Sequence, residues 1–121
     1  MKLNSFCVEE NIIIKEAISV IQDNRSRCII VLNNKKKVVG TFSEGDVLKA
    51  ILKEIDLHTP LKKLLKPSFY YLNQRDMLRA YDLVKQHGIS LVPVINSDFV
   101  LQDVITIFDI MDHLVFVNNK K

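Results

Sequence analysis

Apolar and polar positions follow one another along the first half of the chain in blocks that predict five elements. Four apolar residues have the i, i+3, i+4, i+7 spacing of one helix face: Ile14, Ala17, Ile18 and Ile21. The apolar run 28–32 and the run 38–42 predict two strands, the first of them buried. The segment 43–48 opens a second helix, and a short strand is expected before the first one. The predicted order is strand, helix, strand, strand, helix.

The second half repeats this pattern after a shift of 63 residues, without a gap. The helix face recurs at 77–84, the strands at 91–96 and 101–105, and the start of the second helix at 106–111. Identities between the halves are few, notably Ala17/Ala80, Val31/Val94, Asn33/Asn96 and Asp46/Asp109. The prediction therefore depends on the order of the elements. We predict an α/β fold of two tandem β-α-β-β-α repeats.

The boundaries of these repeats follow from a proline-flanked segment in the middle of the chain. We expect the first repeat at 1–58, a linker helix at 59–67, and the second repeat with a C-terminal tail at 68–121. Pro60 stands at the position where proline is tolerated in a helix, and Pro67 at the point where the helix would end. Leucines in this segment are spaced along one face. These features predict a short linker helix between the two repeats.

The composition is that of an ordinary globular domain. The chain has 121 residues, of which 48% are hydrophobic and 26% charged, with three Gly and three Pro. Its longest apolar runs are far shorter than the about 18 to 20 residues that span a bilayer. The start of the chain lacks the apolar stretch and cleavage site of a secretory signal. We therefore expect the chain to be cytoplasmic or a fragment, with no membrane partner.

Charge and cysteine content exclude two further classes of protein. The net charge is +3, and the basic runs 35–37 and 62–63 are short and isolated, so no nucleic-acid partner is expected. Cys7 and Cys28 lack the spacing of metal ligands. Cys28 lies inside an apolar run, where a free cysteine is usually a small buried hydrophobe.

No catalytic or metal-binding motif is present in the sequence. His58, His87 and His113 are scattered and form no i, i+4 pair, which argues against a zinc site. A chain with three glycines has neither a glycine-rich phosphate loop nor a G-x-S-x-G nucleophile turn. We therefore expect no catalytic residues, no metal and no enzymatic activity.

Both halves place a hydroxyl residue and an aspartate three positions apart where a strand gives way to a helix. These pairs are Ser43 with Asp46 and Thr106 with Asp109. One interpretation is a helix cap, in which the hydroxyl and the acid satisfy each other's backbone amides. The other is a ligand site, because free amides favour an anion and a carboxylate accepts hydrogen bonds from two vicinal hydroxyls. A ribose phosphate needs that combination, and the spacing alone leaves both interpretations open.

The chain resembles the paired cystathionine-beta-synthase-type (CBS) domains, also called a Bateman module. The resemblance lies in the stretches 27–31, 38–48, 88–94 and 104–110, which are similar to the family's apolar Pro-Val strand, its Val-Gly-Ile-Val-Thr-like strand and its x-x-Asp-Leu helix start. It extends from about Ser5 to about His113. It implies a pseudo-two-fold pair of repeats that binds adenine nucleotides or related adenosyl ligands in clefts between the halves.

By the same resemblance, six residues are expected to bind the ligand. The ribose-binding acid corresponds to Asp46 and Asp109, and the hydroxyl near it to Ser43 and Thr106. A basic residue that contacts phosphate in some members corresponds to Arg27, with Ser90 opposite it in the second half. The candidate ligands are AMP, ADP, ATP and S-adenosylmethionine, and no cofactor is expected. Since only the first half supplies a positive charge, Arg27, we expect the tighter site there.

These expectations amount to a non-catalytic regulatory module. The resemblance implies a homodimer, and two wide apolar helix stripes are candidates for its interface: Val47, Leu48, Ile51 and Leu52 in the first half, and Phe108, Met111 and Val115 in the second. It also implies a larger parent enzyme such as a sugar nucleotidyltransferase. Two alternatives remain, a dimerisation scaffold that binds no ligand and a small enzyme.

Overall fold

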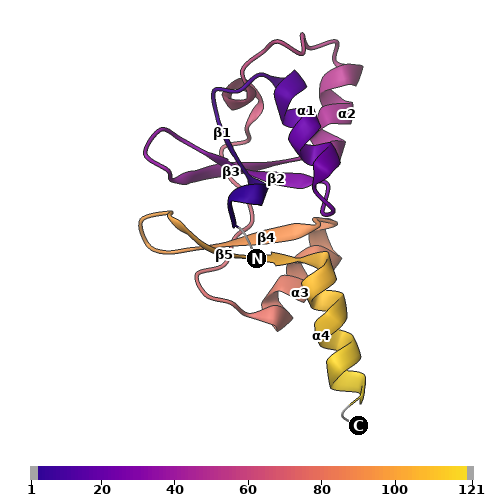
Figure 1. The fold of residues 1–121 in the computed structure, drawn as a ribbon. Coiled ribbons are helices and arrows are strands. Elements are labelled where there is room, and N and C mark those ends of the chain that lie inside the picture. Colours follow the sequence, from indigo (N-terminus) through magenta and orange to yellow (C-terminus); the bar gives the residue numbers. More distant parts are fainter. Residues whose placement is uncertain (1–2, 120–121) are drawn as a thin grey trace. The chain divides into compact units, whose positions relative to one another are not determined.

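The computed structural model describes residues 3–119 and divides the chain into two compact units, Met1–Phe69 and Tyr70–Lys121 (Figure 1). The first unit contains, in chain order, η1 (Leu3–Phe6), β1 (Cys7–Glu9), α1 (Ile14–Asp23), β2 (Cys28–Leu32), β3 (Val38–Ser43), α2 (Glu44–Leu52) and η2 (Leu61–Leu64). The second contains α3 (Met77–His87), β4 (Leu91–Ile95), β5 (Leu101–Thr106) and α4 (Ile107–Asn119). The α/β class and both predicted pairs of helices are confirmed.

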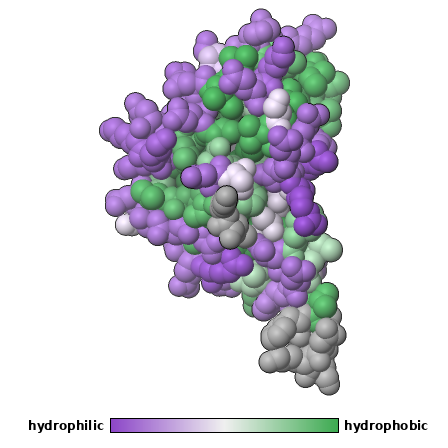
Figure 2. Space-filling model, in the orientation of Figure 1, coloured by the Kyte–Doolittle hydropathy of each residue, from purple (hydrophilic) through white to green (hydrophobic). Residues whose placement is uncertain are grey.

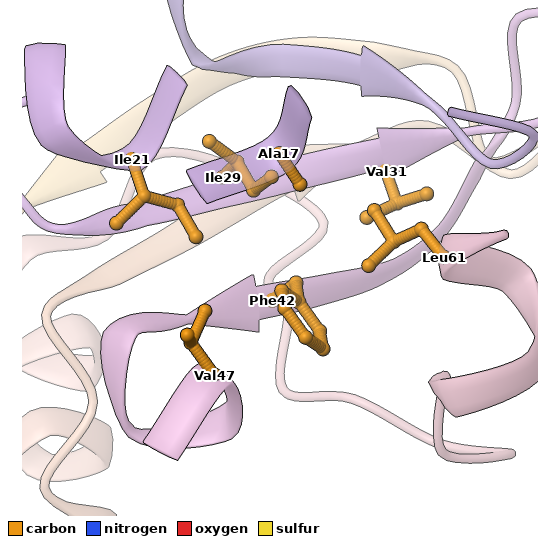
Figure 3. Packing of buried hydrophobic residues seen from close by; sticks show 7 residues of the cluster. All are labelled: Ala17, Ile21, Ile29, Val31, Phe42, Val47 and Leu61. Atoms are coloured by element: carbon orange, nitrogen blue, oxygen red, sulfur yellow. The ribbon is translucent and has the colours of Figure 1, made fainter. Parts of the chain in front are cut away.

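The first unit is a three-stranded sheet covered by helices. β1 runs parallel to β2, and β2 pairs antiparallel with β3. Side chains of α1, β2, β3, α2 and η2 meet in one core: Ala17, Ile21, Ile29, Val31, Phe42, Val47 and Leu61 (Figure 3). Burial alternates along β3, so one face of this strand enters the core.

The second unit has the same order of elements, with one difference. β4 and β5 pair antiparallel, and their core includes Ala80, Val92 and Ile105. The short strand expected before α3 is reduced to Leu72, which forms a single parallel bridge with Val94. Leu72 donates to Pro93 and accepts from Ile95, and the chain bends immediately afterwards. The expected first strand is therefore wrong for this half, because the bend ends the pairing after one residue.

The expected linker helix is a single 3₁₀ turn, η2. Pro60 precedes it with an extended backbone and supplies no side-chain cap. Leu61 is fully buried in the core of the first unit. Leu65, just after the turn, lies 3.3 Å from the point where a Cβ on Gly40 would stand. The segment therefore packs on the first unit, and the glycine in β3 leaves room for it.

The hairpins of the two units turn in the same way. The side-chain oxygen of Asn33 accepts hydrogen bonds from the backbone of Lys35 and Lys37, and that of Asn96 does the same for two backbone amides of its own turn. Lys36 and Phe99, which are equivalent under the repeat, share a left-handed φ of 63°. The two units therefore share the backbone conformation of their hairpin turns.

No helix in the described part of the chain has the length and hydropathy that a membrane span requires.

Candidate functional site

In the first unit, the junction between β3 and α2 is a complete capping box. Ser43 is the N-cap of α2, and its hydroxyl accepts from the backbone N–H of Asp46 at 3.3 Å. The Oδ2 of Asp46 accepts in return from the backbone N–H of Ser43 at 2.9 Å and from its hydroxyl at 3.0 Å. These bonds satisfy amides that a helix start leaves without partners.

The second unit repeats this box between β5 and α4. The Oδ2 of Asp109 accepts from the backbone N–H of Thr106 at 2.9 Å, and the Thr106 hydroxyl accepts from the N–H of Asp109 at 3.1 Å. The capping interpretation is therefore confirmed in both halves. In each box the bonds use Oδ2, and within residues 3–119 no hydrogen bond occupies the Oδ1 of Asp46 or Asp109. Capping and ligand binding are thus compatible at these acids.

The strand before each box brings the positions of Arg27 and Ser90 to the junction. Cys28 pairs with Ser43, and Leu91 pairs with Thr106. In addition, Glu44 donates its backbone N–H to the carbonyl of Arg27 at 3.1 Å, and Ile107 donates to that of Ser90 at 2.9 Å. The structure therefore brings together, within each unit, the three site residues that the sequence assigned to it.

The side chain of Arg27 does not point to the first junction, where the sequence analysis expected it to bind a phosphate. It is exposed, and its Nη1 donates to the carbonyl of Gln22 at 3.3 Å, in the last turn of α1. The described structure has no hydrogen bond or ion pair between this guanidinium and Ser43 or Asp46. The reason is local: Arg27 has a left-handed φ of 53°, and its guanidinium finds a backbone acceptor in the helix that precedes it.

The second unit holds a positive charge that the sequence analysis missed. Arg75, in the segment before α3, places Nη1 at 2.8 Å from the Oδ2 of Asp103 and Nη2 at 4.0 Å from the Oδ2 of Asp109. The expectation that only the first half has a cation at its junction is therefore wrong. The only signal in the sequence was the acid at position 103 where the repeat has Gly40, and Arg75 is 28 positions away from that acid.

The cysteine nearest the first junction is chemically inert. Burial, and then the negative charge of Asp46, raise the pKa of Cys28 to about 12, so the thiol stays protonated. Burial also raises the pKa of Cys7. Both cysteines are free, and Cys28 is buried as predicted. In the described part of the chain, no three His, Cys, Asp or Glu side chains gather as a metal-ligand set.

Comparison with protein families and solved structures agrees with this architecture. The family model of the CBS domain matches residues 1–53. A CBS domain protein from Pyrobaculum aerophilum complexed with AMP is 24% identical, covers 91% of this chain and 90% of its own, and has a TM-score of 0.74. A CBS domain pair/ACT domain protein from Thermotoga maritima is 18% identical, covers 97% and 98%, and also has a TM-score of 0.74. The cytosolic domain of the Mg²⁺ channel MgtE in complex with ATP is 19% identical, covers 88% and 44%, and has a TM-score of 0.69.

Three curated proteins resemble the chain in sequence over most of its length. An uncharacterized 17.7 kDa protein from Acidianus ambivalens is 24% identical over 93% of this chain. A homoserine O-acetyltransferase from Methanobrevibacter ruminantium is 28% identical over 95% of it, and an A-adding tRNA nucleotidyltransferase from Aquifex aeolicus is 27% identical over 92%. The chain spans 69%, 23% and 13% of these relatives, respectively. Residues 1–53 thus match the CBS domain family, and the chain as a whole has the fold of a CBS domain pair.

Proposed function

We propose that the chain is a non-catalytic regulatory module that senses an adenine nucleotide or a related adenosyl ligand. The observation that carries the proposal is the duplicated junction: in each unit, a hydroxyl and an aspartate are fixed at a helix start, and one carboxylate oxygen has no hydrogen bond to the described residues. The AMP and ATP complexes of proteins with this fold support the choice of ligand class.

Each acid has two tasks in this proposal. Oδ2 of Asp46 or Asp109 holds the cap, while Oδ1 accepts hydrogen bonds from the two vicinal hydroxyls of a ribose. Because the cap fixes the carboxylate before the ligand arrives, little side-chain entropy is lost on binding. In α2, Gly45 leaves the helix start free of a bulky side chain, so a ligand can approach closely.

The neighbouring residues complete the two sites. Ser43 and Thr106 keep the acids oriented, and Ser90 contributes its backbone at the second junction. Arg27 is exposed, and among the described residues its guanidinium bonds only to a carbonyl, at 3.3 Å. We infer that it exchanges this weak contact for the phosphate of a bound nucleotide. AMP, ADP, ATP and S-adenosylmethionine remain the candidate ligands.

The proposal also includes a parent enzyme and a homodimer. The chain is a fragment of a larger enzyme, and a sugar nucleotidyltransferase is our candidate for that enzyme. It also forms a homodimer through apolar helix residues that the fold leaves exposed, namely Leu48, Ile51 and Leu52 on α2, and Met111, Leu114 and Val115 on α4. Apolar surface over α2 and on α4 is visible in Figure 2.

The test is a thermal-shift and calorimetry series on the full chain with the four candidate ligands and adenosine. A ligand present at 100 times its Kd should stabilise the fold by about 2.7 kcal/mol, which raises the melting temperature measurably. Asp46→Asn, which keeps most of the cap but removes the charge, should lose most of the affinity at the first site. No shift with any adenosyl compound would contradict the proposal.

The same exposed helix faces favour a second candidate, a scaffold that dimerises its parent protein and binds no ligand. Leu52 is 84% exposed, and an apolar side chain this open is costly unless a partner covers it. A chain that dimerises but shows no shift with the five compounds would support the scaffold.

A further inference from the structure

In the second unit, an ion pair occupies two positions that are apolar in the first. The shift of 63 residues aligns Arg75 with Ile12 and Asp103 with Gly40. In the first unit, Ile12 packs against the core and Leu65 lies against Gly40. In the second, the guanidinium of Arg75 lies 2.8 Å from the carboxylate of Asp103. The two units therefore differ at the same pair of positions, and the difference is one of charge.

Asp103 fixes the guanidinium next to the acid of the capping box. Arg75 uses Nη1 for Asp103 and, at 3.5 Å, for the carbonyl of Val104, while Nη2 lies 4.0 Å from the Oδ2 of Asp109. The Arg75 side chain nevertheless stays 44% exposed. Since a guanidinium has five N–H donors, several remain for a ligand that approaches from solvent.

The charges around this arginine indicate what that ligand carries. Without Arg75, Asp103 and Asp109 would present two negative charges, which repel a phosphate. With Arg75 between them, the site offers a fixed, planar donor that matches phosphate geometry. An ion pair as exposed as this one adds little to folding stability, whereas a charge-assisted bond to a ligand adds substantially to affinity.

We propose that Arg75 recognises the phosphate of an adenosyl ligand in the second unit and that Asp103 is its positioning residue; this inference rests on the proposed function. Arg75 thus takes the part that the first unit gives to Arg27, although it comes from a different element. The second unit accordingly prefers AMP to adenosine, and the phosphate accounts for the preference.

The test measures AMP and adenosine binding by titration calorimetry in the Asp46→Asn variant of the chain, in which the first site is weakened about 10-fold or more. Arg75→Gln should weaken AMP binding by about 10-fold or more and leave adenosine binding within about twofold. The matched control is Arg79→Gln, which removes the same charge from an exposed position of the same unit. It should change neither affinity.

Asp103→Asn tests the positioning role. This variant keeps the charge of Arg75 and weakens its anchor, while it also removes one negative charge that repels phosphate. The affinity for AMP should therefore fall by less than in Arg75→Gln. The ratio of AMP to adenosine affinity is the informative measurement, because a loss of folded protein lowers both affinities together.

The remaining outcomes separate this inference from the proposed function. Equal losses of AMP and adenosine binding, or no loss in Arg75→Gln, would overturn the role of Arg75 and leave the proposed function in place. Binding that disappears completely in Asp46→Asn would show that the second unit holds no ligand, and would likewise overturn the role of Arg75. A wild-type chain that binds neither compound would end both proposals.

Discussion

At the scale of single residues, one acid in each unit serves both the fold and the proposed site. Asp46 and Asp109 cap their helices through Oδ2, and no residue in the described part of the chain bonds to the other oxygen of either carboxylate. A cap bond is worth about 1 kcal/mol, while a charge-assisted bond to a ligand is worth about 1.5 to 3 kcal/mol. A substitution that keeps the cap but removes the charge therefore separates the two tasks.

We expect Asp46→Ala to lower the free energy of unfolding by about 1 kcal/mol, because the backbone N–H of Ser43 loses its acceptor. Asp46→Asn should cost less, since an amide oxygen still accepts that bond. Both should weaken nucleotide binding about 10-fold or more. Urea unfolding and calorimetry measure the two effects. Asp82→Ala, at an exposed position on α3, is the control and should change neither quantity.

The thiol of Cys28 predicts a pH dependence. Its pKa rises from 9.0, the ordinary value that the unfolded chain keeps, to about 12 in the fold. Above pH 9.0 the unfolded state releases the proton while the folded state retains it, so stability falls as the pH rises. We expect Cys28→Ala to remove a slope of up to about 1.4 kcal/mol per pH unit. The free energy of unfolding is measured by urea unfolding at several pH values above 9.0 for both proteins. The same slope against pH in the wild type and in Cys28→Ala would contradict the prediction.

At the scale of elements, helix and hairpin ends account for most of the local precision of the fold. Gly88 ends α3 with a left-handed φ of 66°, and its N–H donates to Val84 at 2.8 Å. Glycine is the usual residue at a left-handed helix C-cap, because it has no Cβ to strain that backbone. Lys36 and Phe99 adopt a similar backbone without being glycine, at turns whose asparagines supply extra hydrogen bonds.

Two glycines should respond in opposite ways to alanine. Gly88→Ala should lower the free energy of unfolding by about 1 kcal/mol or more, because a Cβ strains a left-handed residue. Gly45→Ala should raise it by up to about 1 kcal/mol, since α2 gains a better helix former and the new Cβ meets only the Ser43 hydroxyl at 3.6 Å. Thermal or urea unfolding distinguishes them. Equal changes in the free energy of unfolding for the two variants would show that strain at Gly88 does not destabilise the fold.

At the scale of the whole molecule, each unit buries one hydrophobic core and leaves one apolar helix face open. Val47 of the predicted stripe on α2 enters the core, but Ile51 and Leu52 stay 51% and 84% exposed. On α4, Met111 and Val115 are more than half exposed as well. The stripes are therefore only partly used by the fold, as a dimer interface requires.

We expect the double variant Ile51→Lys/Leu52→Lys to be monomeric at concentrations where the wild type is a dimer, because two charges would be buried without partners. Leu78→Lys is the matched control: Leu78 is 72% exposed on α3, outside both stripes, and should leave the dimer intact. Light scattering with increasing protein concentration measures both. A wild type that stays monomeric, or a control that dissociates equally, would refute the proposed interface.

The sequence by itself determined the features that depend on neighbours a few positions apart. Helix faces, the two buried strands and both capping boxes follow from spacings of two to four residues, which local backbone geometry converts directly into contacts. The family resemblance assigned Arg27 to the first box, and the repeat shift gave Ser90 as its counterpart in the second. The pairing of β2 with β3 and of β4 with β5 brings both positions to the boxes. The alignment of the two repeats could not predict where the guanidinium of a long side chain such as Arg27 lies.

Only the tertiary structure decided the contacts that join distant segments. The ion pair of Arg75 with Asp103 depends on where the loop before α3 meets β5, and no periodicity encodes that meeting. The bond of Arg27 to Gln22 depends on a left-handed backbone at a non-glycine residue. The loss of the first strand to a single bridge at Leu72 depends on a bend after it. In each case, packing of the whole unit outweighs local preference. Asp46 and Asp109 could therefore be identified from the sequence, whereas the positions of the arginine side chains near them required the structure.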